Sequence, residues 1–519
     1  MSEPEKLPRS WLMAPISHIA DVNPRSFCPL PGAVDEFVHF VPMSAVEAEF
    51  GGMNVSQMRP LGEVQKGYTS FLPDDVLFAK ITPCMENGKV AVVPALANHI
   101  AFGSTEFHVL RAQDGIRAAW LAYFLSQSEF RRFARQHMTG SAGQLRVSAR
   151  WLSDTKIPVA PSEEQTRIVE KLEELLSGLD AGVAELKAAQ KKIAQYRQSL
   201  LKAAVEGSLT AKWRAKNPSA ETGAQLLQRI LTERRARWEA KQLAKFKEQG
   251  KTPPKDWQQK YPEPVQPETT DLPQLPEGWV WASLDMLGEI VSGVAKGTKR
   301  DANVQVREVP YLRVANVQRG FLNLSEVKTI LATEHDIAEL TLQAGDILFN
   351  EGGDRDKLGR GWVWRDEVAS CIHQNHVFRM RPYMREVLPE LISHHGNTFG
   401  KTWFPNAGKQ TTNLASINMT MLRMFPVPLG PADEQREVLN QLELQIQQIE
   451  RQEQAVEVGL KQSAAQRKNL LKAAFSGQLV SQDQNDEPAS VLLERIRADR
   501  IAAAARKHSR ARLHTREST

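Results

Sequence analysis

Cationic and amide side chains recur beside glycines in this sequence, in segments typical of exposed turns. Lysine and arginine supply charge for phosphates, and arginine, asparagine and glutamine can form paired hydrogen bonds with base edges. Candidates in the first half of the chain are Lys80, Thr82, Asn87, Lys89, Gln144 and Arg146. Those in the second half are Lys296, Lys299, Arg300, Arg313, Asn316, Arg355, Lys357, Arg360, Lys409, Gln410, Thr412 and Asn413. Because a solvated surface charge is the alternative for every basic residue, we expect only part of this set to bind nucleic acid.

Patterns that could indicate catalysis each depart from the arrangement that their chemistry requires. Residues 396–402 resemble a phosphate-binding loop but have three residues between the glycines instead of four, and they follow a helix-like segment. Glu326 and Lys328 have a nuclease-like spacing without an upstream Pro-Asp pair. The Asn-Pro pair at 23–24 continues as Arg-Ser, unlike an adenine methyltransferase motif. The residues therefore favour a binding protein without a catalytic site.

A short run of cysteine and histidine could suggest zinc. Cys371, His373 and His376 lie within six residues of one another. We match residues 376–379 with 108–111, because both read His-Val-x-Arg, and the first segment offers only His108. An ordinary strand histidine is therefore the preferred interpretation, and we predict no metal site.

The elements that must position these residues are organised around a long repeat. Residues 163–207 recur without gaps as residues 433–477, at an offset of 270. Each copy predicts a helix of roughly 65 Å with an apolar residue every seventh position. The seam residues are Leu172, Leu179, Leu186, Ile193, Leu200, Leu442, Ile449, Val456 and Leu470, with Ser463 as one imperfect position. We expect the two copies to pack on each other as a spacer, although two separate arms for other proteins are an alternative.

Each long helix follows a module with short β-like runs. Leu7 to Trp11 returns as Leu275 to Trp279, and the Asp-Asp pair at 74–75 matches the Gly-Asp pair at 345–346. We expect strands at 37–41, 75–79, 89–93, 309–315, 346–350 and 377–381, and a helix-like patch at 116–133. A basic helical run and a Pro-rich linker follow the first long helix, and the tail repeats the basic run. These features predict two similar α+β modules in tandem.

Composition sets the outer bounds. The chain has 519 residues, a net charge of +5 and 24% charged residues, and no apolar run is long enough to cross a membrane. The first residues lack an apolar signal-peptide core. The three cysteines, Cys28, Cys84 and Cys371, are scattered, so we expect a reduced, cytoplasmic protein. The positive charge permits nucleic-acid binding without requiring it.

Together these motifs resemble the specificity subunits of type I restriction–modification systems over nearly the whole chain. The resemblance rests on the two Glu-Gln-led helices that end in Leu-Lys-Ala-Ala, the segment 207–214, the segment 78–89 and the Leu-Pro-x-x-Trp openings. It implies an α+β fold in which two target-recognition domains, separated by two long antiparallel coiled-coil helices, form a pseudo-two-fold tandem. The implied divisions are 1–161 and 273–431 for the domains and 162–207 and 432–477 for the long helices. A basic segment with linker, 208–272, and a basic tail, 478–519, complete the chain.

The resemblance also implies a function. Members of that family bind a bipartite, asymmetric DNA site and direct adenine methylation or restriction by two modification subunits and two motor–nuclease subunits. This chain is then expected to bind no cofactor itself, with S-adenosylmethionine, ATP and Mg²⁺ on its partners. A self-contained nucleic-acid enzyme with a diverged site, or a coiled-coil adaptor that does not bind DNA, is the alternative.

Overall fold

The structure, a computed structural model, divides into two compact units. Unit 1 comprises Met1–Lys187 and Val456–Thr519, and unit 2 comprises Ala188–Ala455. The residues that it describes are 7–24, 35–50, 52–97, 99–141, 143–295, 305–353, 358–407 and 415–517. Both divisions fall inside long helices, so each unit contains part of α6 (Ser162–Val205) and part of α14 (Ala432–Phe475).

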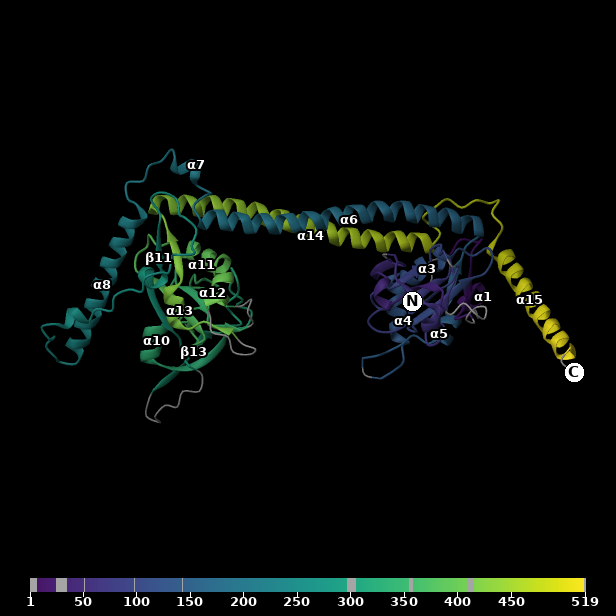
Figure 1. The fold of residues 1–519 in the computed structure, drawn as a ribbon, viewed down its shortest axis with the longest axis horizontal. Helices are drawn as coiled ribbons and strands as arrows, with labels where there is room; N and C mark the ends of the chain where they lie inside the picture. Colours follow the sequence, from purple (N-terminus) through teal and green to yellow (C-terminus); the bar gives the residue numbers. More distant parts are fainter. Residues whose placement is uncertain are drawn as a thin grey trace. The chain divides into compact units, whose positions relative to one another are not determined.

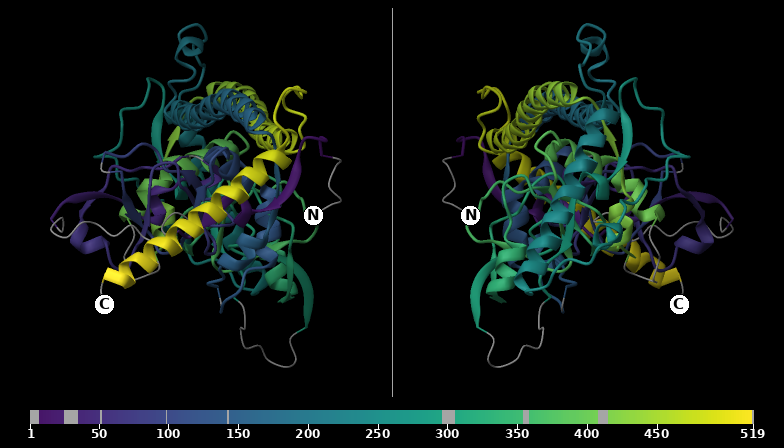
Figure 2. Two further views of the ribbon diagram at one scale, coloured as in Figure 1. Left: turned by 90° about the vertical axis from the view of Figure 1, so that its right-hand side faces the viewer. Right: turned by 90° about the vertical axis from the view of Figure 1, so that its left-hand side faces the viewer.

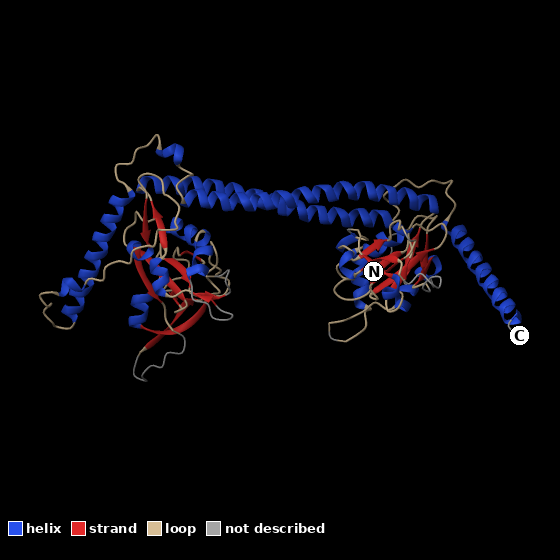
Figure 3. Ribbon diagram, in the orientation of Figure 1, coloured by secondary structure: helices blue, strands red, loops and turns tan. Residues whose placement is uncertain are grey.

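Unit 1 combines two four-stranded sheets with short helices (Figures 1 and 3). The first sheet has the order β2-β9-β6-β7, the second has the order β4-β3-β8-β5, and β1 pairs with β10. The strands are β1 (Leu12–Pro15), β2 (Ala20–Val22), β3 (Phe37–Val41), β4 (Met58–Pro60), β5 (Thr69–Phe71), β6 (Val76–Ala79), β7 (Val90–Val92), β8 (Ala101–Gly103), β9 (Phe107–Ala112) and β10 (Lys156–Val159). The helices are α1 (Ile16–Ile19), η1 (Met43–Ala45), η2 (Ala48–Phe50), α2 (Leu61–Val64), α3 (Ala118–Ser126), α4 (Ser128–Gln136), α5 (Ala149–Asp154) and, near the C-terminus, α15 (Ala489–Glu517).

Unit 2 has a related set of sheets. The orders are β12-β19-β15-β17, β14-β13-β18, β11-β21 and β16-β20. The strands are β11 (Val280–Ser283), β12 (Gly288–Ser292), β13 (Val306–Leu312), β14 (Lys328–Thr333), β15 (Ile347–Asn350), β16 (Gly352–Gly353), β17 (Gly361–Val363), β18 (Ile372–His373), β19 (Val377–Pro382), β20 (Ala415–Ser416) and β21 (Pro426–Leu429). The helices are α7 (Ala211–Arg214), α8 (Gly223–Glu248), η3 (Trp257–Lys260), α9 (Leu284–Leu287), α10 (Glu334–Leu340), α11 (Pro389–Thr398), α12 (Gly400–Ala407) and α13 (Met419–Met424).

Strand β6 lies between two of the hydrophobic cores of unit 1. Successive side chains of a strand point to opposite faces, so a strand with a core on each face is apolar throughout. Val76 and Phe78 lie in the core that contains the helices α3 and α4. Leu77 and Ala79 lie in the core that the second sheet covers. In unit 2, β15 is divided in the same way between two cores, so the expected α+β character is confirmed for both units.

Proline and glycine determine where the long helices begin and end. Pro161 and Pro431 directly precede α6 and α14, each of which has 44 residues. Gly207 and Gly477 follow them with φ of +70° and +73°, in the left-handed region that glycine adopts without strain. Equivalent backbone hydrogen bonds close both ends: Gly207 N donates to Ala204 O and Gly477 N to Ala474 O.

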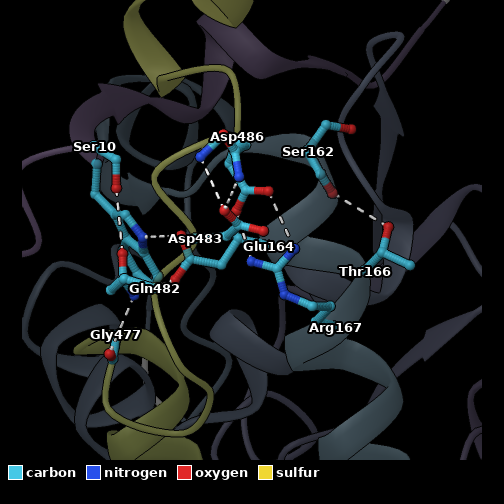
Figure 4. A network of polar contacts seen from close by, with 11 residues as sticks. Ser10, Ser162, Glu164, Thr166, Arg167, Gly477, Gln482, Asp483 and Asp486 are labelled. Carbon is cyan, nitrogen blue, oxygen red and sulfur yellow. Dashed lines mark hydrogen bonds and ion pairs between the residues drawn. The ribbon is translucent and has the colours of Figure 1, made fainter.

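The start of α6 is held by a buried polar network within unit 1 (Figure 4). Glu164 is almost fully buried and accepts a hydrogen bond of 2.9 Å from the indole nitrogen of Trp11. It also accepts a bond from Gln482, and Arg167 pairs with Asp486 at 2.6 Å. Burial raises the pKa of Glu164 despite these donors. The network joins the first residues of the chain, α6 and the segment after α14.

Within each unit α6 and α14 lie side by side (Figures 1 and 2). In unit 1 the Cβ position of Gly459 faces the Leu186 side chain, and Arg467 pairs with Asp180. In unit 2 Arg197 pairs with Glu453 at 2.9 Å. Of the predicted seam residues, five are buried: Leu172, Leu200, Leu442, Ile449 and Val456. The other four, Leu179, Leu186, Ile193 and Leu470, are half-buried.

The basic helices pack through one apolar face. Thr222 and Gln225 form a capping box at the start of α8, which then buries Leu226, Ile230 and Arg234. The Arg234 guanidinium donates to Asp285 at 3.1 Å, while Trp238 stacks on Trp257 of the returning linker. The equivalent residues of α15, Leu492 and Ile496, are buried in unit 1. No helix in the described part of the chain combines the length and apolar character needed to cross a membrane.

Most predicted elements occur close to their expected positions. The segment 37–41 is β3 with the predicted bounds, β6, β7 and β15 lie within their predicted ranges, and β19 extends one residue beyond its predicted end, to Pro382. The predicted strand at 309–315 begins three residues earlier, at Val306. The helix-like patch 116–133 is two helices, α3 and α4, because the chain is extended at Gln127.

Candidate nucleic-acid interface

In each unit a buried aspartate forms an ion pair with an arginine of a neighbouring strand. Asp75 is almost fully buried and accepts bonds of 2.8 and 2.7 Å from Arg111, and its carboxylate also accepts from Leu72 N. In unit 2, Asp346 and Arg381 form the same bidentate pair at 2.7 and 2.6 Å. These pairs fix β6 against β9 and β15 against β19.

This ion pair corrects one match made from the sequence. We matched residues 376–379 with 108–111, but Phe78 lies opposite His108 and Phe349 lies opposite Phe378. His108 is therefore equivalent to Phe378, at the same offset of 270 that relates the long helices. The local His-Val-x-Arg pattern was wrong because it ignored the arginine that pairs with the buried aspartate.

In unit 1 the structure brings together four of the predicted residues at the end of β6. Lys80 directly follows β6, and the segment 139–146 folds back beside it through paired backbone hydrogen bonds between Thr139 and Arg146. The Thr82 hydroxyl donates to Gly143 O at 2.9 Å and accepts from Leu145 N at 3.1 Å. Gln144 is exposed at this turn. Thr82 therefore shapes the turn that presents Gln144 and Arg146.

Arg146 is held in one orientation by a residue that the sequence analysis missed. Its guanidinium donates to the Glu106 carboxylate at 2.8 to 3.2 Å, and both side chains are partly exposed. The hydrogen bonds from Arg146 lower the pKa of Glu106. Because Glu106 lies 40 residues before Arg146 and in no motif, no spacing signal could have identified it.

Asn87 and Lys89 lie in the turn before β7. Asn87 is exposed, whereas the Lys89 amine donates to the backbone oxygen of Met43 at 2.8 Å. In unit 2, Arg360 makes the equivalent contact with Val314 O at 3.2 Å. Both cations therefore bind the loop that follows β3 or β13, a structural contact that the sequence did not reveal.

Asn316 is not available for base recognition in this conformation. It is almost fully buried, its amide nitrogen donates to Asn323 O and Glu326 O, and its amide oxygen accepts from Arg313 N. Arg313 is about one-quarter exposed and lies 3.6 Å from Glu326. Asn316 thus shapes the loop that carries Arg313, because its amide forms three hydrogen bonds there.

The remaining predicted contacts lie outside the described residues. They are Lys296, Lys299, Arg300, Arg355, Lys357, Lys409, Gln410, Thr412 and Asn413.

Unit 2 also has a polar pair that we did not single out for nucleic acid. The Nδ1 atom of His376 lies 2.5 Å from a carboxylate oxygen of Glu351, and the histidine side chain is about half exposed. Glu351 directly follows β15, as Lys80 directly follows β6.

The described residues lack a metal-binding cluster of three or more histidine, cysteine or acidic side chains. His373 is fully buried and its Nδ1 lies 2.6 Å from Val377 O. The phosphate-loop-like segment 396–402 lies in α11 and α12 rather than between a strand and a helix.

Comparison with known proteins agrees with this architecture. Residues 53–193 match the type I restriction modification DNA specificity domain. The EcoAI specificity subunit of Escherichia coli is 27% identical over 499 residues, covering 86% of this chain and 79% of that protein. The EcoEI specificity subunit of E. coli is 26% identical over 494 residues, covering 85% and 78%. This chain is a homologue of the type I specificity subunits.

Solved structures support the same fold. A chain from a type I restriction–modification system covers 92% of this chain and all of its own length, with a TM-score of 0.63 and 18% identity. The HsdS subunit of Thermoanaerobacter tengcongensis covers 92% of this chain and 99% of its own, with a TM-score of 0.50 and 16% identity. These two chains therefore share the described fold across most of this chain.

Proposed function

We propose that this chain is the DNA sequence-recognition subunit of a type I restriction–modification complex. It binds a bipartite, asymmetric DNA site, with one half recognised by each unit, and directs adenine methylation or restriction by partner subunits. Like the specificity subunits that it resembles, it supplies recognition and not catalysis. One observation supports this proposal most directly. The chain is homologous to specificity subunits, and its two units share one framework of contacts but differ in their exposed polar side chains.

The framework is repeated contact by contact. Trp11 donates to Glu164 at 2.9 Å, and Trp279 donates to Glu434 at 2.9 Å. Each long helix also begins with a glutamine whose amide donates to the same backbone position, Ala160 O in unit 1 and Gly430 O in unit 2. This repeated framework supports two recognition domains, approximately 1–161 and 273–431. Each has its own hydrophobic core, and the chain enters and leaves each through the same contacts.

Recognition of DNA bases needs exposed guanidinium and amide groups, and binding of DNA phosphates needs positively charged side chains. In unit 1, Gln144 and Arg146 are the proposed base contacts, and Lys80 is a proposed phosphate contact. In unit 2, Arg313 is the proposed contact among the described residues. The undescribed lysine, arginine, glutamine and asparagine candidates remain part of this proposal.

We assign the spacer role to α6 and α14, as an antiparallel coiled coil between the recognition domains. Contacts that support it include Asp180 with Arg467 and Arg197 with Glu453, since the partner in α14 comes earlier as α6 advances. A helix of 44 residues is about 65 Å long. The same helices are the proposed docking surface for two modification subunits.

The proposed complex also contains two motor–nuclease subunits and acts in the cytoplasm. S-adenosylmethionine, ATP and Mg²⁺ are assigned to the partners, and none to this chain. The expected division of labour is that this chain orients DNA while its partners carry out the chemistry.

Reconstitution tests the proposal directly. The purified chain alone should neither methylate nor cut DNA, and addition of two modification subunits per chain should produce adenine methylation at one bipartite sequence. Mass measurement of the active complex gives the ratio. Methyl transfer by the homogeneous chain alone, or methylation independent of sequence in the complex, would refute it.

A further inference from the structure

The two units can be aligned residue by residue around the end of the central strand. Lys80 N donates to Glu106 O at 2.9 Å, and Glu351 N donates to His376 O at 3.0 Å. Lys80 is therefore equivalent to Glu351, and Glu106 to His376. The strand register gives the same result, because Ala79 pairs with Phe107 and Asn350 with Val377.

A second backbone contact places a third position beside these two. Val147 N donates to Lys80 O at 2.9 Å, and Ile417 N donates to Glu351 O at 2.8 Å. The residues that precede them, Arg146 and Ser416, are therefore equivalent. We call the three positions A (Lys80 or Glu351), B (Glu106 or His376) and C (Arg146 or Ser416).

The backbone is the same at these positions, but the side chains differ in charge. In unit 1 the carboxylate is at position B and holds the guanidinium at position C, with Lys80 at position A. In unit 2 the carboxylate is at position A and holds the imidazole at position B. Ser416, at position C, is exposed. Each unit thus has one nitrogen-bearing side chain oriented by a carboxylate, at different positions.

We propose that the carboxylate-held side chains at these positions determine base choice in each half-site: Arg146 at position C reads a base in unit 1, and His376 at position B reads a base in unit 2. Lys80, at position A of unit 1, keeps its proposed phosphate contact. Glu106 and Glu351 are positioning residues that orient these readers. This inference rests on the proposed function. It adds Glu106, Glu351 and His376 to recognition and states why the units read different bases.

The chemistry of the two readers differs. A guanidinium fork can donate to both O6 and N7 of guanine, and a carboxylate behind it fixes the plane of the fork. Nδ1 of His376 is occupied by Glu351, and Nε2 has no hydrogen bond among the described residues. His376 therefore offers one contact to a base edge, and Arg146 offers two, so guanine is the base expected opposite Arg146.

The decisive experiment places the unit 1 residues of positions A, B and C at the equivalent positions of unit 2. The variant Glu351→Lys, His376→Glu, Ser416→Arg is assembled with the modification subunits and assayed by methylation of a randomised duplex library. One position of the second half-site should shift towards guanine, by on the order of 10- to 100-fold in preference. The first half-site should not change.

A control variant tests whether rearranging charged side chains elsewhere in unit 2 has this effect. Arg307 and Glu334 form an exposed pair at 3.1 Å in the same unit. Exchanging them (Arg307→Glu, Glu334→Arg) should leave both half-sites as in the wild type. A shift of the same size in this control would overturn the assignment to positions A, B and C.

A single conservative variant covers failure of the triple variant to assemble. Arg146→Lys keeps the charge but not the fork, so it should lose guanine preference at one position of the first half-site while DNA affinity changes little. Unchanged preference in an assembled Arg146→Lys or triple variant would overturn the inference while leaving the proposed function intact. A wild-type complex without a bipartite site would overturn the proposed function itself, and this inference with it.

Discussion

Mild acid should unfold unit 2 before unit 1, because two histidines are fully buried in unit 2. His373 Nδ1 lies 2.6 Å from Val377 O, and His395 Nε2 lies 2.8 Å from Pro426 O. The His395 ring is also stacked on Phe399. Burial lowers the pKa of each of these histidines, and that of the neighbouring His394, from 6.5 to about 4, so all three are neutral in the folded unit near pH 6.

The direction and size of the effect follow from linkage. Above about pH 6.5 all three histidines are neutral in the folded and unfolded states, and they add no pH dependence. Between about pH 6.5 and pH 4 only the unfolded state binds their protons, so each pH unit removes about 1.4 kcal/mol per histidine. Across that interval each removes on the order of 3 kcal/mol from the free energy of unfolding, on a typical total of about 5–15 kcal/mol. In unit 1, burial lowers the pKa of only one histidine, His108, so its loss should be smaller.

Urea unfolding at pH 7, 6 and 5, followed by hydrogen exchange of peptides from each unit, measures the effect. The variant His395→Phe keeps an aromatic ring against Phe399 but removes one of three proton sites, so the pH slope of unit 2 should fall by about one-third. It should cost about 1 kcal/mol at pH 7, because Pro426 O loses its donor. Equal stability of unit 2 at pH 7 and pH 5, or an unchanged slope in His395→Phe, would refute this reasoning.

Three further outcomes are expected. Asp75→Asn should lower the free energy of unfolding of unit 1 by about 2 kcal/mol. This is less than the usual loss for a broken buried ion pair, because Arg111 is about one-third exposed. Urea titration measures the free energy, and an unchanged value would contradict the structural role of the pair. In DNA titrations at several salt concentrations, Lys80→Ala should weaken binding to all sequences and reduce the salt slope by about one, whereas Gln144→Ala should relax base choice; a sequence-selective loss in Lys80→Ala would contradict its phosphate role. Inserting seven residues into both α6 and α14 should lengthen the preferred spacer by about three base pairs with some loss of affinity, and an unchanged spacer in an active variant would exclude the helices as the ruler.

Local patterns in the sequence predicted the regular elements well. The run at 75–79 predicted a strand, which the structure shows with a core on each face, and the Pro and Gly residues around the long helices marked their bounds. These features depend on neighbours in the chain, so spacing alone is informative about them.

Contacts between distant residues could not be predicted in the same way. Glu106 holds Arg146, and Lys89 binds a backbone oxygen of Met43, and neither partner has a distinctive sequence pattern. The match of His108 with His376 failed for a related reason, because similar short patterns occur in two registers and only the buried ion pair selects one. The polar side chains that lie together in each unit could therefore be grouped only from three-dimensional contacts.

Replacing one recognition module tests the central claim most directly. Residues 7–160 are exchanged for the equivalent module of a relative, and adenine methylation is mapped across a genome that carries the hybrid and its modification partner. The account predicts that one half of the bipartite target takes the relative's sequence while the other half is unchanged. A change in both halves, or no change in either half from an assembled and active hybrid, would contradict independent recognition by the two units.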